Sequence, residues 1–92
     1  MKFQTGTVIS GTLRTDDLLR AFAQELNRHR PDDPLADWAF VLCSYGYDDP
    51  AEANDCLNQL FDALSIIAEP HGCYFGAHPG DGADFGFWEN ES

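Results

Sequence analysis

Carboxylates are the side chains of this 92-residue sequence whose number and distribution suggest a chemical role. Sixteen Asp and Glu stand against five Lys and Arg, which gives a formal net charge of −11 at pH 7. All five Lys and Arg lie in residues 1–30 beside three acids, whereas residues 31–92 hold thirteen acids and neither Lys nor Arg. The charge is therefore +2 in the first segment (five minus three) and −13 in the second.

This partition of charge limits the class of partner. Residues 31–92 cannot pair with a Lys or Arg of their own, so their surface is solvated, uses the N-terminal arginines or meets a cationic partner. Nucleic acid and anionic membrane are excluded as direct partners of that surface, because their phosphates would be repelled. We expect a basic protein as the partner, one that itself binds nucleic acid.

Acids in residues 48–69 have a spacing that fits such a partner. Asp55, Asp62 and Glu69 are seven residues apart, so on a helix they share one exposed face, with about 10 Å between neighbours. Exposed helix faces usually alternate acids with Lys or Arg, and that compensation is absent here. A rigid row of carboxylates can replace phosphates in a cationic groove; the alternative is that the acids only confer solubility. The predicted partner-binding residues are Asp48, Asp49, Glu52, Asp55, Asp62, Glu69, Asp81 and Asp84.

Metal binding is the next chemistry that the side chains suggest. His78, Asp81 and Asp84 are three residues apart around a glycine-rich loop and could converge on an ion. Asp and Gly are, however, the residues that tight turns require, and the spacing of a calcium-binding loop is absent. We therefore predict turn chemistry at this loop, with no metal and no cofactor.

Nucleophilic catalysis would need a cysteine activated by a histidine. Cys73 lies two residues from His71, but no third group is in evidence to orient the pair. The three cysteines are odd in number, have no C-x-x-C spacing and occur at or beside apolar positions, which predicts buried, unreactive free thiols. The sequence therefore predicts no catalytic residue and a protein that is not an enzyme.

The first half of the chain must position these groups through one strand and two helices. Residues 3–10 are rich in β-branched side chains and predict a strand, and Thr15 is a credible N-cap for an amphipathic helix that ends before Pro31. Residues 35–45 are ambiguous between helix and buried strand. Asp33-Pro34, a cap followed by proline at the first helical position, favours the helix, with Gly46 just beyond its end.

The second half predicts a long helix followed by a hairpin. Asp49-Pro50 begins a helical pattern that lasts five turns and stops at Pro70. The period then changes to two, which predicts strands over 73–78 and 84–88 joined through a loop at 79–83. The fold class is α+β in the order β-α-α-α-β-β, a three-stranded antiparallel sheet packed on two to three helices. Residues 1–92 form a single acidic domain.

The sequence also bears on where the protein works. No run approaches the roughly 18 apolar residues of a membrane span, and residues 1–6 lack the apolar stretch of a signal peptide. We expect the protein in the cytoplasm of a bacterial host cell, with no membrane partner.

Residues 73–88, CYFGAHPGDGADFGFW, together with LFDAL at 60–64 and GTLRTDDL at 11–18, resemble a family of small acidic proteins found on phages, plasmids and other mobile elements. Residues 30–48 depart from that pattern. The resemblance implies a mobile-element origin and assigns no catalytic residue. Small, acidic, non-enzymatic proteins of that origin often resemble counter-defence inhibitors, including anti-CRISPR proteins and DNA mimics that block host nucleases.

Three functional hypotheses follow from the sequence, of which the third is a small metal-dependent enzyme around His78, Asp81 and Asp84. The first is a counter-defence inhibitor whose acidic, DNA-mimicking surface binds the basic nucleic-acid site of a host complex, such as a CRISPR effector or a nuclease. The second is an interaction module whose C-terminal aromatic hairpin docks a partner or a second copy of the chain through Tyr74, Phe75, Phe87 and Trp88.

Overall fold

The computed structural model describes residues 5–12, 14–78 and 80–89. The elements in chain order are β1 (Gly6–Ile9), α1 (Thr15–His29), α2 (Pro34–Tyr45), α3 (Pro50–Ala68), the 3₁₀ turn η1 (Glu69–His71), β2 (Cys73–His78) and β3 (Asp81–Glu89). The predicted α+β class and element order are confirmed, and the ambiguous stretch after Pro34 is a helix. The last strand begins earlier than predicted, at Asp81, so the loop of the hairpin is shorter than 79–83.

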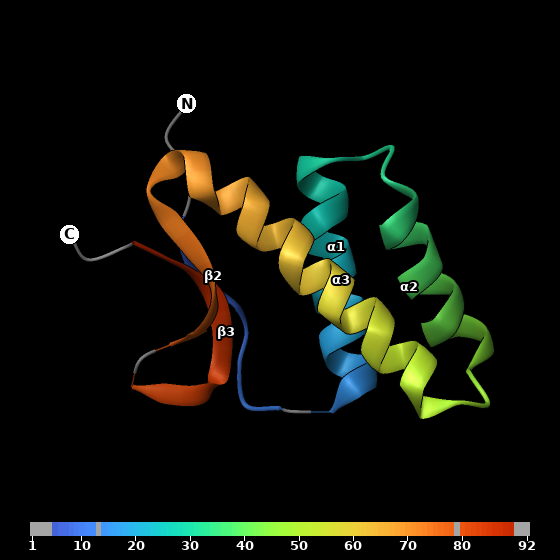
Figure 1. The fold of residues 1–92 in the computed structure, drawn as a ribbon. Helices are drawn as coiled ribbons and strands as arrows, with labels where there is room; N and C mark the ends of the chain where they lie inside the picture. The colour runs from blue at the N-terminus through green and yellow to red at the C-terminus, as the bar shows by residue number, and fades with distance from the viewer. Residues whose placement is uncertain (1–4, 13, 79, 90–92) are drawn as a thin grey trace.

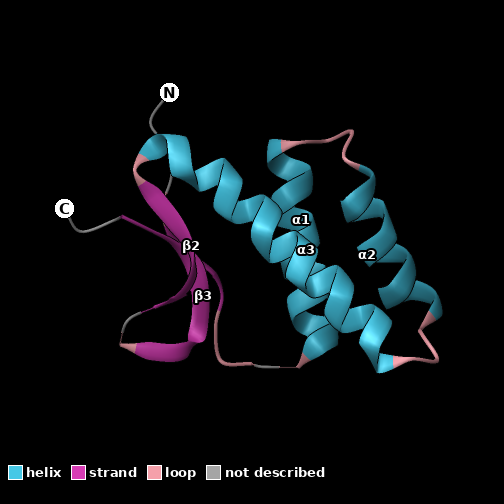
Figure 2. Cartoon of the chain, in the orientation of Figure 1, coloured by secondary structure: helices cyan, strands magenta, loops and turns pink. Residues whose placement is uncertain are grey.

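The three strands form one antiparallel sheet in the order β1-β3-β2 (Figures 1 and 2). Helix α1 packs against β1 and α3 packs against β2, so that both helices lie on the same side of the sheet. Helix α2 packs on α1 and α3 and lies on their far side, away from the strands. The other face of the sheet is left without a covering helix among the described residues.

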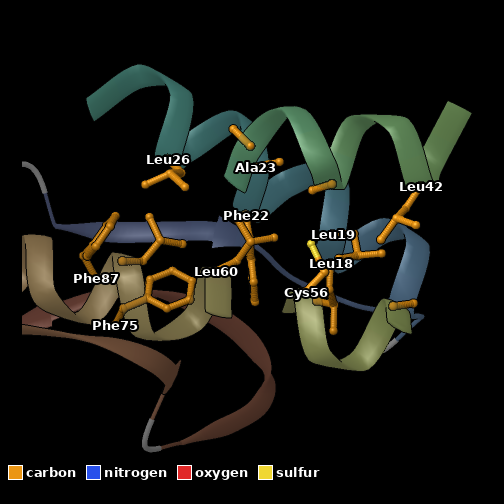
Figure 3. Packing of buried hydrophobic residues seen from close by; sticks show 14 of the residues in the cluster. Leu18, Leu19, Phe22, Ala23, Leu26, Leu42, Cys56, Leu60, Phe75 and Phe87 are labelled. Carbon is orange, nitrogen blue, oxygen red and sulfur yellow. The ribbon is translucent and has the colours of Figure 1, made fainter. Parts of the chain in front are cut away.

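The core lies where α1 meets α3 and the sheet (Figure 3). Phe22 of α1 is its central ring, and its edge-on contacts have centroid separations of 4.9 Å to Phe75 and 5.7 Å to Phe85. Edge-to-face pairs of this kind add to the hydrophobic gain of burying the rings. Seven large side chains are almost completely buried: Phe22, Phe87, Leu19, Leu26, Leu60, Leu64 and Cys56.

The helix starts follow local capping chemistry in two of three cases. The carboxylate of Asp33 accepts a hydrogen bond from the Leu35 N–H, and that of Asp49 accepts one from the Ala51 N–H, both at 2.9 Å. Each cap is followed by proline at the first helical position, as predicted. The predicted cap at Thr15 is wrong, because Thr15 is already helical and the N-cap position is Arg14.

Gly86 has a role that no local pattern predicts. A β-bulge in β1 between Thr7 and Ile9 brings the backbone of β1 against β3 at this point. A Cβ atom added to Gly86 would lie 2.2 Å from the carbonyl oxygen of Gly6, which is far inside contact distance. Glycine is therefore required at position 86 for β1 to pair with β3.

Candidate partner-binding surface

The N-terminal end of α3 gathers four of the predicted acids. Asp48, Asp49, Glu52 and Asp55 are all exposed there. Two of them also stabilise the helix, because Asp49 caps it and Glu52 lies in its first turn, where the helix dipole favours anions. Part of this cluster thus has a structural explanation that does not involve a partner.

The remaining acids of α3 continue along its outer face. Asp62 and Glu69 are exposed, as is Asp55, so the predicted stripe faces solvent over its whole length. The buried side of the same helix is formed by Ala53, Cys56, Leu60, Leu64 and Ala68. Glu69 is the C-cap residue of α3, an unfavourable position for an anion, since the carbonyl groups there carry partial negative charge. Stabilisation of the helix does not explain Glu69.

Ion pairing does not neutralise this stripe within the part of the chain that the structure describes. Both ion pairs found there lie on α1, where the Glu25 carboxylate meets Arg28 and also lies 3.2 Å from the Nε2 atom of His29. The described arginines, at positions 14, 20, 28 and 30, are all exposed on α1 or its flanks. The electrostatic field of the α3 acids is therefore not cancelled by described cations, and these acids would attract a cationic surface.

The two hairpin acids do not belong to the same surface. Asp81 and Asp84 lie on β3, at the opposite end of the molecule from the N-terminus of α3 (Figure 1). The side chain of Asp81 is outside the described residues. Asp84 is half-buried, and its Oδ1 atom is buried without a hydrogen-bond partner among the described residues. The eight predicted residues thus separate into a group of six near α3 and a pair on the sheet.

The aromatic hairpin separates into two faces. Phe75 and Phe87 are 3% and 2% exposed and belong to the core, so the expectation that all four rings form a docking surface is wrong for these two. Tyr74 and Trp88 are half-buried cross-strand partners. Because side chains alternate along a strand, these two rings lie on the face of the sheet away from the helices.

Two of the three thiols, those of Cys43 and Cys56, have environments that lower their reactivity. Cys56 is fully buried, and this desolvation raises the pKa of its thiol to about 11. Partial burial also raises the pKa of Cys43, although that side chain is not in the core as the sequence suggested. A thiol with a raised pKa holds little thiolate at neutral pH, and thiolate is the nucleophilic form. All three cysteines are free.

A polar contact ties the start of α1 to the loop after α2. The hydroxyl of Tyr47 donates a 2.8 Å hydrogen bond to the Oδ1 atom of Asp16, and this bond raises the pKa of the tyrosine. Asp16 thereby has a structural contact between α1 and the loop that follows α2. Within the described ranges, no three His, Cys, Asp or Glu side chains are grouped as metal ligands would be, and no helix there has the length and apolarity to cross a membrane.

Sequence reasoning missed two further surface features. Open hollows of about 360 and 210 Å³ lie between β1 and α1. The larger has Asp17 and Arg20 in its wall and the smaller Glu25 and Arg28, so neither carries a net charge that would select an ionic ligand. The second feature is the exposure of two large apolar side chains of α2, because Val41 is 50% exposed and Tyr45 is 86% exposed. The sequence could have indicated this exposure, since a helix that is apolar on nearly every side cannot bury all of its apolar side chains.

Comparison of the chain with protein-family models, with curated proteins and with solved structures gave no significant match. The assignment of a function therefore depends on the charge, burial and contacts described above.

Proposed function

We propose that the protein is a non-enzymatic inhibitor that binds the basic, nucleic-acid-binding site of another protein with the acidic face of α3. The observation that carries the proposal is the exposed row of carboxylates along one helix, in a segment of sixty-two residues without Lys or Arg. The face consists of Asp48, Asp49, Glu52, Asp55, Asp62 and Glu69, which we call the α3 acidic stripe.

The dimensions of the α3 acidic stripe support this reading. From the N-cap Asp49 to the C-cap Glu69 the helix rises through twenty residue steps, which extend about 30 Å. The same length of B-DNA holds about nine base pairs, at about 3.4 Å per phosphate along each strand. Carboxylates held on a helix lose little conformational freedom on binding, which favours a fixed array over a disordered acidic tail.

The physiological setting is part of the proposal. The resemblance of residues 73–88 to small acidic proteins of mobile elements suggests a counter-defence inhibitor, of the anti-CRISPR type, acting in the cytoplasm of a bacterial host cell. Its partner would be a nucleic-acid-binding host complex such as a CRISPR effector or a nuclease. Competition with nucleic acid for one basic site requires no catalytic residue and no cofactor.

Affinity capture from bacterial lysate at low and high salt tests this proposal. The baits are the wild-type chain, Asp55→Lys/Asp62→Lys, and the control Asp32→Lys/Asp37→Lys, whose acids are exposed outside the stripe. Both variants have the same net charge of −7 (−11 plus four), so they differ only in where charge is reversed. We expect wild type and control to retain a nucleic-acid-binding protein that duplex DNA or salt displaces, and the stripe variant to lose it. Equal capture by all three baits, or capture insensitive to salt, would contradict the proposal.

The second candidate is an interaction module that uses the outer face of the sheet. The half-buried, uncovered pair Tyr74 and Trp88 supports it. In the same capture experiment this module predicts that Tyr74→Ser abolishes retention of the partner while Asp55→Lys/Asp62→Lys has no effect. The two candidates therefore give opposite results with the Asp55→Lys/Asp62→Lys bait, and Tyr74→Ser is added as a fourth bait.

A further inference from the structure

Helix α2 is apolar on its outer side as well as on the side that it buries. It packs on α1 and α3, and Figure 1 shows it at the far side of these helices from the sheet. On its outer side Val41 and Tyr45 are 50% and 86% exposed, and Asp37 is the one charged residue among the twelve of the helix. Helices that are apolar on all sides are normally buried on all sides. The outer side of α2 therefore lacks a covering element among the described residues.

The apolar residues of this outer side have the spacing of a helix–helix seam. Pro34, Trp38, Val41 and Tyr45 are separated by four, three and four residues, which is the alternation found in coiled coils. At 3.6 residues per turn they fall within about 60° of one another around the helix axis. Three of them are exposed and Trp38 is half-buried, so the row is accessible along the whole helix. We call these four residues the α2 seam.

The positions of the acids indicate which occupant fits the α2 seam. A chain with a net charge of −11 can meet a second copy of itself only through a face that holds few carboxylates. The α3 acidic stripe fails this condition, whereas the α2 seam contains no charged residue and meets it. Around the helix, one flank of the seam holds Asp37 and Ser44 and the other holds Leu35 and Leu42. A basic helix would be selected by acids along both flanks, so the seam favours a second copy.

An antiparallel arrangement makes two α2 seams complementary. With a two-fold axis beside positions 39 and 40, Trp38 faces Val41 of the second copy. Asp37 then lies on the same flank as Ser44 of the second copy, about 3 Å away along the helix axis, so that the hydroxyl can donate to the carboxylate. The two Asp37 residues are displaced by about 7.5 Å along the axis and by an interaxial distance of about 8–10 Å, which exceeds the Debye length at physiological salt. In a parallel pair each Asp37 would instead meet the apolar flank, without a donor.

We propose that two copies of the chain associate through antiparallel contact of their α2 seams. The helix is twelve residues long, about 18 Å, so the contact buries on the order of 300 Å² on each copy, below the roughly 800 Å² of a standard interface. The association is therefore reversible, with a dissociation constant on the order of 0.1 mM. It goes beyond the proposed function, because it uses no residue of the α3 acidic stripe.

Sedimentation equilibrium of the full chain tests the association, with protein from about 10 µM to 1 mM in about 20 and 500 mM NaCl. We expect a monomer–dimer equilibrium that tightens about threefold or more at the higher salt, because screening reduces the repulsion between two copies of net charge −11. The same change of salt should weaken capture of a partner by the α3 acidic stripe. The two proposals therefore predict opposite responses to ionic strength.

Two substitutions of the same kind separate the seam from apolar exposure in general. Val41→Glu on α2 and Ile66→Glu on α3 each replace an exposed β-branched side chain, 50% and 57% exposed, and each gives a net charge of −12 (−11 minus one). Val41→Glu should weaken dimerisation at least about tenfold, since it places carboxylates in the contact, and Ile66→Glu should leave it within about twofold. Val41→Gln, which adds no charge, should weaken it about fivefold. Melting temperatures should change little, because both positions are exposed.

Proton–nitrogen NMR locates the contact, because the two tryptophans of the chain report separately. On concentrating the protein, the Trp38 indole signal should shift and the Trp88 signal should not. Shifts at Trp88 alone would place the contact on the sheet and overturn the α2 seam. A chain that stays monomeric at about 1 mM in both salts, or equal weakening by Val41→Glu and Ile66→Glu, would also overturn it.

The remaining outcomes separate the α2 seam from the proposed function. A monomeric chain whose lysate partner is lost in Val41→Glu would identify a foreign helix as the occupant and overturn self-association. Failure of the capture experiment with a dimer that Val41→Glu disrupts would overturn the inhibitor proposal alone. Capture through the α3 acidic stripe by a chain that never dimerises would overturn the α2 seam and leave the inhibitor proposal standing.

Discussion

Helices α1 and α3 bury similar apolar faces in the same core, but their exposed faces differ in how the charged side chains are paired. Each contributes fully buried leucines to the same core, Leu19 and Leu26 from α1 and Leu60 and Leu64 from α3. On its polar side α1 pairs Glu25 with Arg28 and His29, whereas no ion pair of an α3 acid is found within the described ranges. The buried faces hold the fold together, so helix stability does not explain the acids at Asp55, Asp62 and Glu69, and the proposed function assigns them to partner binding.

The equivalence of the buried faces predicts the largest effect. Leu60→Ala and Leu26→Ala each remove a fully buried side chain, so each should lower the free energy of unfolding by about 2–5 kcal/mol. Urea denaturation of both variants measures this. A cost below about 1 kcal/mol for Leu60→Ala alone would mean that α3 is not an integral part of the core, and the comparison with α1 would fail.

The buried face of α3 also predicts a dependence of stability on pH. Burial raises the pKa of Cys56 from its ordinary value of 9.0 to about 11 in the folded chain, so the fold favours the protonated thiol. This stabilising contribution is complete below pH 9 and is lost as the pH rises through 11, because the unfolded chain releases the proton first. Urea midpoints between pH 8 and 11 should fall more steeply for wild type than for Cys56→Ala. Parallel curves would show that the thiol is solvated.

The difference between the polar faces predicts opposite signs for two similar substitutions. Glu25→Gln removes the carboxylate that meets Arg28 and His29 and should lower stability by about 0.5–1 kcal/mol. Asp62→Asn removes an exposed charge without a described cationic neighbour and should leave stability unchanged or raise it by up to about 0.5 kcal/mol. Thermal unfolding at low salt measures both. A loss of stability in Asp62→Asn equal to that in Glu25→Gln would show that a cationic side chain of the same chain pairs with Asp62, and the comparison would fail.

The smallest effect is expected at the end of α3. Glu69→Gln removes a negative charge from a helix C-terminus and should stabilise the protein by about 0.3–1 kcal/mol at low ionic strength. Salt should reduce the gain, so melting curves at 20 and 500 mM NaCl form the test. Destabilisation by this substitution would mean that Glu69 makes a structural contact. Glu69 would then no longer be counted among the partner-binding residues of the α3 acidic stripe.

Most of the local structure could be predicted because neighbours in sequence determine it. Helical periodicity indicated where the helices lie. Two helix starts could be predicted from Asp33-Pro34 and Asp49-Pro50, because each Asp accepts a hydrogen bond from the N–H group two residues later. The charge partition is likewise a property of the sequence, and it led to the stripe on α3. The cap at Thr15 failed because Thr12 provides the side-chain contacts there, donating to Asp17 and accepting from the Arg14 N–H.

The tertiary structure alone decided which residues share a surface. A period of two separates the faces of a strand without saying which face meets the helices, so Phe75 and Phe87 in the core and Tyr74 and Trp88 outside could not be assigned in advance. The strand order β1-β3-β2 brings Gly6 onto Gly86, a contact between residues eighty positions apart. Sequence thus determined the helices and the sign of the charge through short-range periodicity and composition. Long-range strand pairing and packing determined that the acids form two groups and that Asp84 is partly buried without a partner among the described residues.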